Sequence, residues 1–204
     1  MGKGFIFSLL IIAVMAGCKD KQKRLPFLQQ DVVGKDTVYR TIPAFKFLNQ
    51  DSLAVTNKDF DGKIYVADFF FTTCPTICPI MHRNLLKVYN KYLDNPEVKL
   101  ASHTIDMKYD TPSKMKTYAN KLGVKGDQWE FLWGTRDSVY AIAERNYLVS
   151  VGEDSKAPGG FIHQGYLILV DKHRRIRGAY DGTEDAQVAQ LMDDMDILLA
   201  EESN

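Results

Sequence analysis

Two cysteines follow an apolar aromatic run, and their type and spacing suit redox or metal chemistry. Cys74 and Cys78 are four residues apart in "FFFTTCPTICPIM", and each is followed by proline. Two thiolates this close can exchange with a disulfide or hold a soft metal ion. A disulfide across so short a loop restrains little unfolded-chain entropy, so a purely structural bridge is the weaker interpretation.

A predicted buried strand precedes the cysteines and a predicted helix follows them. The run "KIYVADFFF" is nearly all apolar, which predicts a central strand buried on both faces. Apolar residues recur at helical spacing in "MHRNLLKVYNKYL". Because proline suits the first position of a helix, Pro79 predicts that Cys78 lies near the N-cap. The positive end of the helix would then favour a thiolate at Cys78.

A metal site requires a third ligand, and the chain has four histidines: His82, His103, His163 and His173. Thiolates together with an imidazole suit Cu(I), and imidazole also accommodates Cu(II). His82 is a candidate on local geometry, because it follows Cys78 by four residues and can share its helix face. This reasoning leaves the other three open, since a lone histidine is more often a core or surface residue.

The order of the remaining elements predicts an α/β domain. Alternating strand-like and helix-like segments are followed by two β-like runs and a closing amphipathic helix: "EVKLASHTID", "SKMKTYANKLG", "WEFLWG", "SVYAIAERNYL", "FIHQGYLILVD", "RIRGAYDG" and "DAQVAQLMDDMDILLAEE". This alternation fits a thioredoxin-like sandwich, with a central β-sheet flanked by helices. Residues 25–41 are expected to form an extended lead-in.

The N-terminus predicts export. Lys3 precedes an apolar stretch, Phe5 to Gly17, which spans about 20 Å as a helix and falls short of the roughly 30 Å hydrocarbon core. The junction "VMAGC" resembles the lipobox of bacterial lipoproteins, whose cysteine is lipidated. We therefore expect residues 1–17 to be a lipoprotein signal peptide, Cys18 to carry the lipid, and residues 18–41 to form a tether and lead-in. A plain signal peptide with an incidental Cys18 is the alternative.

Composition predicts one globular domain without a nucleic-acid partner. The chain has 204 residues, of which 45% are hydrophobic, enough for one sizeable core. Lys+Arg and Asp+Glu both total 26, so no net charge attracts a polyanion. We place the domain at residues 42–204.

Three segments resemble, in order and spacing, the Sco/SenC family: "GKIYVADFFFTTCPTICPIM", "TIDMKYDTPSKMKTYANKLG" and "GFIHQGYLILVDKHRRIRG". The resemblance implies a thioredoxin-like, membrane-tethered protein that supplies a copper ion to the binuclear centre in subunit II of cytochrome c oxidase. It also implies copper ligands at Cys74, Cys78 and His163, and so favours His163 over His82. Two departures are Thr76, where family members often have Asp, and "DKHRR", where they often have an Asp-Gly turn.

Further residues in these segments have candidate roles. Asp106 matches an acidic position of the family and is a candidate for orienting the site, with a strand-end or capping role as the alternative. Lys108 and Asp110 are expected in a solvated turn. The glycines of "APGG" before His163 suit a loop that swings the imidazole on and off the metal, with an ordinary flexible loop as the alternative.

The function implied by the resemblance is copper delivery in the bacterial cell envelope, by a metallochaperone whose domain lies outside the cytoplasm. The alternative is a thiol-disulfide oxidoreductase that uses Cys74 and Cys78 without metal and does not need His163. A peroxide-reducing or redox-sensing protein is a third reading of the same cysteine pair. A purely structural lipoprotein is the weakest of these interpretations.

Overall fold

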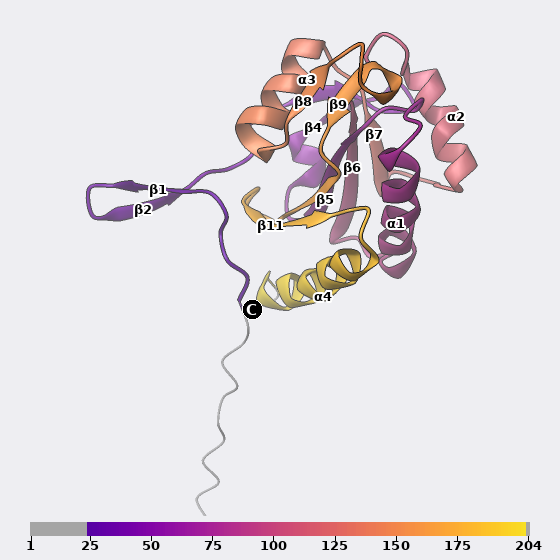
Figure 1. Ribbon diagram of the computed structural model, residues 1–204. Helices are drawn as coiled ribbons and strands as arrows, with labels where there is room; N and C mark the ends of the chain where they lie inside the picture. Colours follow the sequence, from indigo (N-terminus) through magenta and orange to yellow (C-terminus); the bar gives the residue numbers. More distant parts are fainter. Residues whose placement is uncertain (1–23, 203–204) are drawn as a thin grey trace, which may run out of the picture.

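A five-stranded sheet lies at the centre of the protein, with helices on both faces (Figure 1). The computed structural model describes residues 24–202. The strand order is β11-β10-β5-β6-β7, in which β5, β6 and β7 are parallel and β10 is antiparallel to both its neighbours. The strands of this sheet are β5 (Ile64–Phe70), β6 (Val98–Thr104), β7 (Trp129–Leu132), β10 (Tyr166–Val170) and β11 (Ile176–Asp181).

The helices cover the two faces unequally. On one face lie α1 (Ile77–Lys91), α2 (Pro112–Leu122) and α4 (Asp185–Glu202). On the other lies α3 (Arg136–Ile142), continued by a π-helical turn, Ala143–Tyr147. The smaller elements are β1 (Gln30–Val33), β2 (Asp36–Tyr39), β3 (Lys46–Leu48), β4 (Ala54–Thr56), β8 (Val151–Glu153), β9 (Phe161–His163) and two 3-10 turns, Asn57–Phe60 and Pro158–Gly160. The predicted thioredoxin-like sandwich is confirmed.

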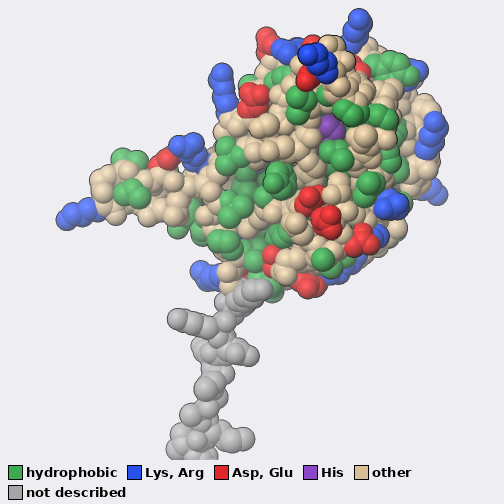
Figure 2. Space-filling model, viewed as in Figure 1, with side chains coloured by type: hydrophobic (Ala, Val, Ile, Leu, Met, Phe, Trp, Pro, Cys, Tyr) green, Lys and Arg blue, Asp and Glu red, His purple; other side chains and the backbone are tan. Residues whose placement is uncertain are grey.

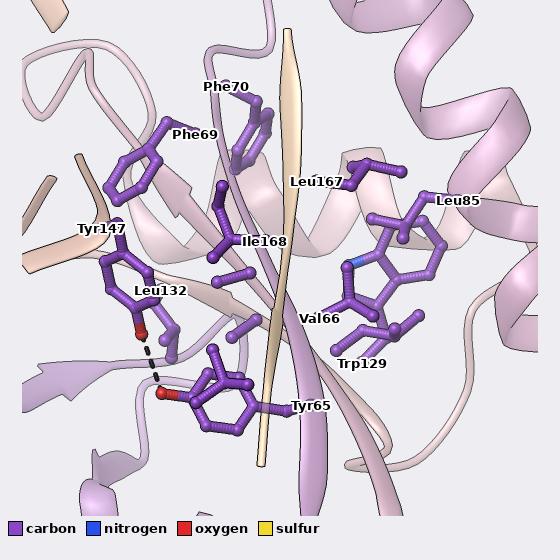
Figure 3. Close-up of a cluster of buried hydrophobic side chains, with 14 of the residues drawn as sticks. Tyr65, Val66, Phe69, Phe70, Leu85, Trp129, Leu132, Tyr147, Leu167 and Ile168 are labelled. Atoms are coloured by element: carbon purple, nitrogen blue, oxygen red, sulfur yellow. Dashed lines mark hydrogen bonds between the residues drawn. The ribbon is translucent and has the colours of Figure 1, made fainter. Parts of the chain in front are cut away.

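Strand β5 is the central strand that the sequence predicts, and all of its residues are buried. Its side chains point alternately to the two faces and so join two hydrophobic layers. Figure 3 shows Phe69 and Tyr147 on one side of the strands and Leu85 and Trp129 on the other. The core therefore holds the carboxyl end of β5 in place, and the cysteine loop begins there.

Helix α1 buries the apolar face that its sequence pattern predicts. Met81, Leu85 and Val88 are fully buried, whereas Leu93, beyond the last turn, is 49% exposed. The first turn of α1 lies at the carboxyl edge of the parallel strands. Loops at such an edge commonly carry functional residues on a rigid scaffold.

The lead-in contains a β-hairpin instead of a single extended segment. Strands β1 and β2 pair antiparallel through a turn at Gly34, whose φ is +67°. The prediction for residues 25–41 captured the extended conformation but missed this turn, which glycine permits at positive φ. The hairpin projects from the body, and its Val32 and Val33 are 75% and 62% exposed (Figures 1 and 2).

The run "FIHQGYLILVD" forms two strands instead of one. Strand β9 pairs with β8 outside the central sheet, and β10 lies between β5 and β11. The chain turns at Gly165, whose carbonyl oxygen accepts a hydrogen bond from Gly182 N at 2.7 Å. Because of this break, His163 lies outside the central sheet. The two β-like runs near the C-terminus pair antiparallel as β10 and β11, on either side of the turn that contains "KHR".

Within residues 24–202, no helix is long and apolar enough to cross a membrane. The predicted signal peptide and Cys18 lie outside the described residues.

Candidate metal site

The cysteine loop connects β5 to α1, and the helix begins earlier than the sequence suggested. It starts at Ile77, so Cys78 is its second residue and Pro79 its third. Thr76 occupies the N-cap, but its hydroxyl lies 3.6 Å from Cys74 Sγ and makes no capping hydrogen bond to the helix, and the first turn contains no acidic residue. The backbone N–H groups at this end of the helix are therefore available to a neighbouring anion. That anion is Cys74, which lies just before the helix.

His163 is brought to the two cysteines by β9. Its Nε2 lies 3.3 Å from Cys78 Sγ and 3.8 Å from Cys74 Sγ. The nitrogen and both sulfurs all lie within 4.8 Å of one another, an arrangement that can hold a metal ion. The imidazole packs edge-on against Phe71, with ring centroids 5.6 Å apart. The three residues that the family resemblance indicates thus converge in space.

The turn Pro158–Gly160 holds the histidine strand against the cysteine loop. Gly159 has φ +76°, and a Cβ added there would lie 2.7 Å from the Phe71 ring and 3.2 Å from Pro75. The glycine therefore permits close contact between two loops as well as a positive φ. In this structure, the loop that was expected to swing His163 is packed against the cysteine loop.

The pKa values of the two thiols are shifted in opposite directions. A hydrogen bond from the Cys78 thiol lowers the pKa of Cys74 to about 3 despite burial, with smaller contributions from His163 and from the backbone N–H groups of Cys78 and Thr76. The same hydrogen bond, together with burial, raises the pKa of Cys78. The helix end was expected to favour a thiolate at Cys78, whereas the hydrogen bond to Cys74 and burial oppose it there. Cys78 lies inside the first helical turn, whereas Cys74 lies in front of the helix and accepts its N–H groups.

His82 does not join the sulfurs. It is fully buried, its Nε2 donates to Asp68 Oδ2 at 2.9 Å, and its Nδ1 lies 2.8 Å from the Tyr118 hydroxyl. Asp68 also accepts a hydrogen bond from Ser102. With both ring nitrogens engaged, His82 serves the packing between α1, α2 and the sheet.

The other two histidines also lie apart from the sulfurs. His103 is fully buried among aromatic rings on the opposite face of the sheet, and neither ring nitrogen has a hydrogen-bond partner among the described residues. Burial lowers its pKa to about 4. His173 lies in the turn between β10 and β11. Among the described residues, His163 is therefore the only histidine that lies with the two cysteines in a group able to hold a metal ion.

Asp106 makes a local turn contact. Its Oδ1 accepts a hydrogen bond from Tyr109 N at 3.1 Å, and its own N–H donates to Thr104 Oγ1 at 3.1 Å. This pattern matches the capping alternative for Asp106.

Asp110 is the residue that the sequence reasoning missed, because it was expected in a solvated turn and is fully buried. Its carboxylate accepts hydrogen bonds from Thr72 N at 2.8 Å, from the Thr72 hydroxyl and from Thr104 Oγ1 at 2.7 Å. Thr72 lies two residues before Cys74, so Asp110 fixes the start of the cysteine loop to β6. The only sequence signal was its place in the family-like segment "DMKYDTP".

Comparison with known proteins places this geometry in a family. A family model described as SCO1/SenC matches residues 34–198, which is most of the chain. This chain belongs to the SCO1/SenC family. A relative in that family, the SCO1 protein homolog of Bacillus subtilis (strain 168), is 29% identical over 167 residues. The alignment covers 79% of this chain and 84% of the relative.

Solved SCO1/SenC structures share the fold. The SCO1/SenC family lipoprotein from Bacillus anthracis str. Ames is 27% identical, with a TM-score of 0.72 over 79% of this chain and 96% of that one. BsSco, described as having a disulfide switch and as a member of the Sco family of cytochrome c oxidase assembly proteins, is 26% identical. Its TM-score is 0.69 over 79% of this chain and 94% of that one. The resemblance seen in the sequence is confirmed.

Proposed function

We propose that this protein holds a copper ion with Cys74, Cys78 and His163 and delivers it to the binuclear centre in subunit II of cytochrome c oxidase during assembly. The observation that carries the proposal is the convergence of two sulfurs and one imidazole nitrogen within 4.8 Å. Soft thiolates with an imidazole are a donor set that suits copper. Family membership supports oxidase assembly as the process, because BsSco is described as a member of a family of such proteins.

The protonation of the pair favours metal capture. Cys74, with a pKa of about 3, is a thiolate at neutral pH and provides the first attachment point for a cation. Cys78 keeps its proton in the metal-free protein and releases it when copper binds, because thiolate is the ligand form. The His163 nitrogen then closes a three-ligand site.

Three ligands leave a coordination position open for an incoming donor. Release then proceeds by ligand exchange, in which a donor atom of the acceptor bonds to copper before the bonds to this protein are lost. Copper need not pass through water, so tight binding and transfer are compatible.

Copper content in the two redox states tests the proposal. The reduced protein should bind about one copper ion per chain, and the Cys74–Cys78 disulfide form should bind essentially none. Metal analysis after loading and gel filtration measures both. Equal copper content in the reduced and oxidised forms would contradict the assignment of the cysteines.

A second candidate function is disulfide exchange by the same pair. It is favoured by the nearness of both thiols and by the low pKa of Cys74, which suits an attacking thiolate. In this function His163 is dispensable, so the behaviour of a His163 variant separates it from copper delivery.

For location, we propose that residues 1–17 are a lipoprotein signal peptide, that Cys18 is lipidated, that residues 18–41 form the tether and lead-in, and that residues 42–204 form the domain outside the cytoplasm. The description of the Bacillus anthracis relative as a lipoprotein supports this arrangement. A Cys18→Ser variant should release the intact domain from the membrane fraction. If the variant stays in the membrane fraction and mass spectrometry finds no lipid on wild-type Cys18, the proposal of a lipid anchor at Cys18 is wrong.

A further inference from the structure

A small apolar groove gives access to the candidate ligands. Its volume is about 240 Å³, and it is lined by Phe71, Cys74, Thr76, Ile77, Ala157, Pro158, Phe161, Ile162 and His163. Apart from the His163 imidazole and the Cys74 sulfur, these lining residues carry no ionisable side chain. Apart from these two candidate ligands, of which Cys74 carries a thiolate, the wall of the groove is thus uncharged.

The groove contains apolar surface that residues 24–202 leave exposed. Ile162 is 51% exposed, and Ile77 and Phe161 are only partly buried. Cys78 and Cys74, by contrast, are 1% and 7% exposed. A donor atom from another protein therefore needs the groove to reach the ligands. Exposed apolar surface at such a place is typical of an interaction site.

We propose that this groove is the surface on which the copper acceptor docks, and that Ile162 is a main contact for an uncharged, apolar segment of the acceptor. The inference rests on the proposed function and adds to it the chemistry of the partner. That segment carries the incoming soft donor, a thiolate, thioether or imidazole, so that docking brings the donor beside copper.

The transfer step is a ligand exchange without a change of oxidation state. A bond from the acceptor's donor to copper forms as a bond from Cys74, Cys78 or His163 breaks. Each cysteine released in a protonated form takes up one proton, and each acceptor thiol that binds loses one. Because the side chains around the buried ligands in the groove are uncharged, encounter lacks strong local electrostatic steering, and we expect the transfer rate to depend little on ionic strength.

A neutral substitution at the rim tests the proposal. Ile162→Gln keeps the size of the side chain and adds no charge beside copper, but it places an amide where an apolar contact is expected. Leu93→Gln is the matched control, because Leu93 is similarly exposed, at 49%, and follows the far end of α1. Copper-loaded wild type and both variants are mixed with two acceptors, the copper-free soluble domain of oxidase subunit II and the small thiol chelator penicillamine.

The expected result is selective. Ile162→Gln should slow transfer to the subunit II domain by about tenfold, because an imperfectly paired amide at an interface costs about 1.4 kcal/mol or more. Its copper content and its transfer to penicillamine should match wild type, as should every property of Leu93→Gln.

Three outcomes would overturn the docking surface: wild-type transfer by Ile162→Gln to the protein domain, equal slowing with both acceptors, or strong salt dependence of the wild-type rate. Failure of the proposed function looks different. In that case copper-loaded wild type does not transfer to the subunit II domain at all.

Discussion

At the residue scale, the two cysteines differ in which one gives up its proton. Cys74 accepts hydrogen bonds from the Cys78 thiol, from His163 and from the backbone at the start of α1, and its pKa falls to about 3. Cys78 is the donor, and its pKa is raised. Cys74 would therefore be the first metal ligand in the proposed copper delivery and the attacking thiolate in disulfide exchange.

Removing the Cys78 thiol, which donates a hydrogen bond to Cys74, should remove this difference in pKa. In a Cys78→Ala variant, the pKa of Cys74 should rise from about 3 toward its ordinary value near 8.5, because its largest stabilising hydrogen bond is lost. The pH dependence of alkylation of the reduced, metal-free protein measures this. Cys74 in the wild type should react down to acidic pH. An unchanged low pKa in the variant would show that the helix end, and not Cys78, stabilises the thiolate.

The sequence identified the site residues unequally, for physical reasons. Cys74 and Cys78 are close in the chain, so their spacing alone predicts a paired site. His163 is distant in sequence and reaches them only through the packing of β9, so family resemblance was needed to select it. His82 has suitable helical spacing, but its ring turns toward the buried Asp68. Spacing along a helix does not reveal which partner a side chain takes.

At the element scale, two loops must pack together to assemble the site. The turn Pro158–Gly160 lies on the cysteine loop, where Gly159 faces Phe71 and Pro75. Asp110 ties the other end of the cysteine loop to β6 through Thr72 and Thr104. The site is therefore held by contacts between elements rather than by any one element.

Two neighbouring glycines provide a matched test of this packing. Gly159→Ala and Gly160→Ala both place a side chain at positive φ, +76° and +86°, and each should lose about 1–2 kcal/mol of stability. The Cβ at Gly159 meets two other residues, Phe71 and Pro75, whereas the Cβ at Gly160 has nothing within 4 Å. Overpacking costs about 1–3 kcal/mol, so Gly159→Ala should weaken copper binding by about tenfold.

Gly160→Ala is the control for backbone strain and should bind copper within about twofold of wild type. Competition titrations of reduced protein against a copper chelator measure both variants, and urea unfolding measures their stability. Equal copper affinities in the two variants would mean that the contact with Phe71 does not position His163.

The elements with strong periodic patterns were predictable and the irregular ones were not. The uninterrupted apolar run of β5 and the apolar stripe of α1 depend on burial alone, and the structure confirms both. The hairpin at Gly34 and the division between β9 and β10 depend on turns and on partner strands elsewhere in the chain. Local composition contains little information about such partners.

At the scale of the whole molecule, the site and the start of the described chain lie at opposite ends. Leu25 N donates to Glu201 Oε1 at 2.6 Å beside the end of α4, far from β9 and the first turn of α1 (Figure 1). The tether proposed before residue 24 would therefore leave β9 and the first turn of α1 at the end of the molecule away from the point of attachment. This orientation suits docking by another protein.

The stability of the whole domain should depend on pH through His103. Its folded pKa, about 4, is lower than the value near 6.5 of an unfolded chain, because burial disfavours the charged form. The unfolded state then binds more protons between these two values. The contribution of His103 is complete above about pH 6.5 and is lost as pH falls toward 4, on the order of 2 to 3 kcal/mol.

His103→Leu should remove this dependence, because it keeps an apolar group of similar size and no ring nitrogen there has a partner among the described residues. Urea unfolding of both proteins at about pH 7 and about pH 4.5 measures the difference. The variant should lose about 2 kcal/mol less than wild type on acidification. Equal losses would mean that another group governs acid unfolding.

Copper titration of two histidine variants tests the central claim most directly. In His163→Ala the cysteines remain but the imidazole beside them is gone, whereas His82→Gln changes a buried hydrogen-bonded residue that does not face the sulfurs. Under reducing conditions, we expect His163→Ala to bind copper at least about a hundredfold more weakly, since even outer partners of metal ligands contribute about 10- to 100-fold. His82→Gln should bind like wild type while unfolding at lower urea concentration. Wild-type copper affinity in His163→Ala would contradict the Cys74, Cys78 and His163 site and favour metal-free disulfide exchange.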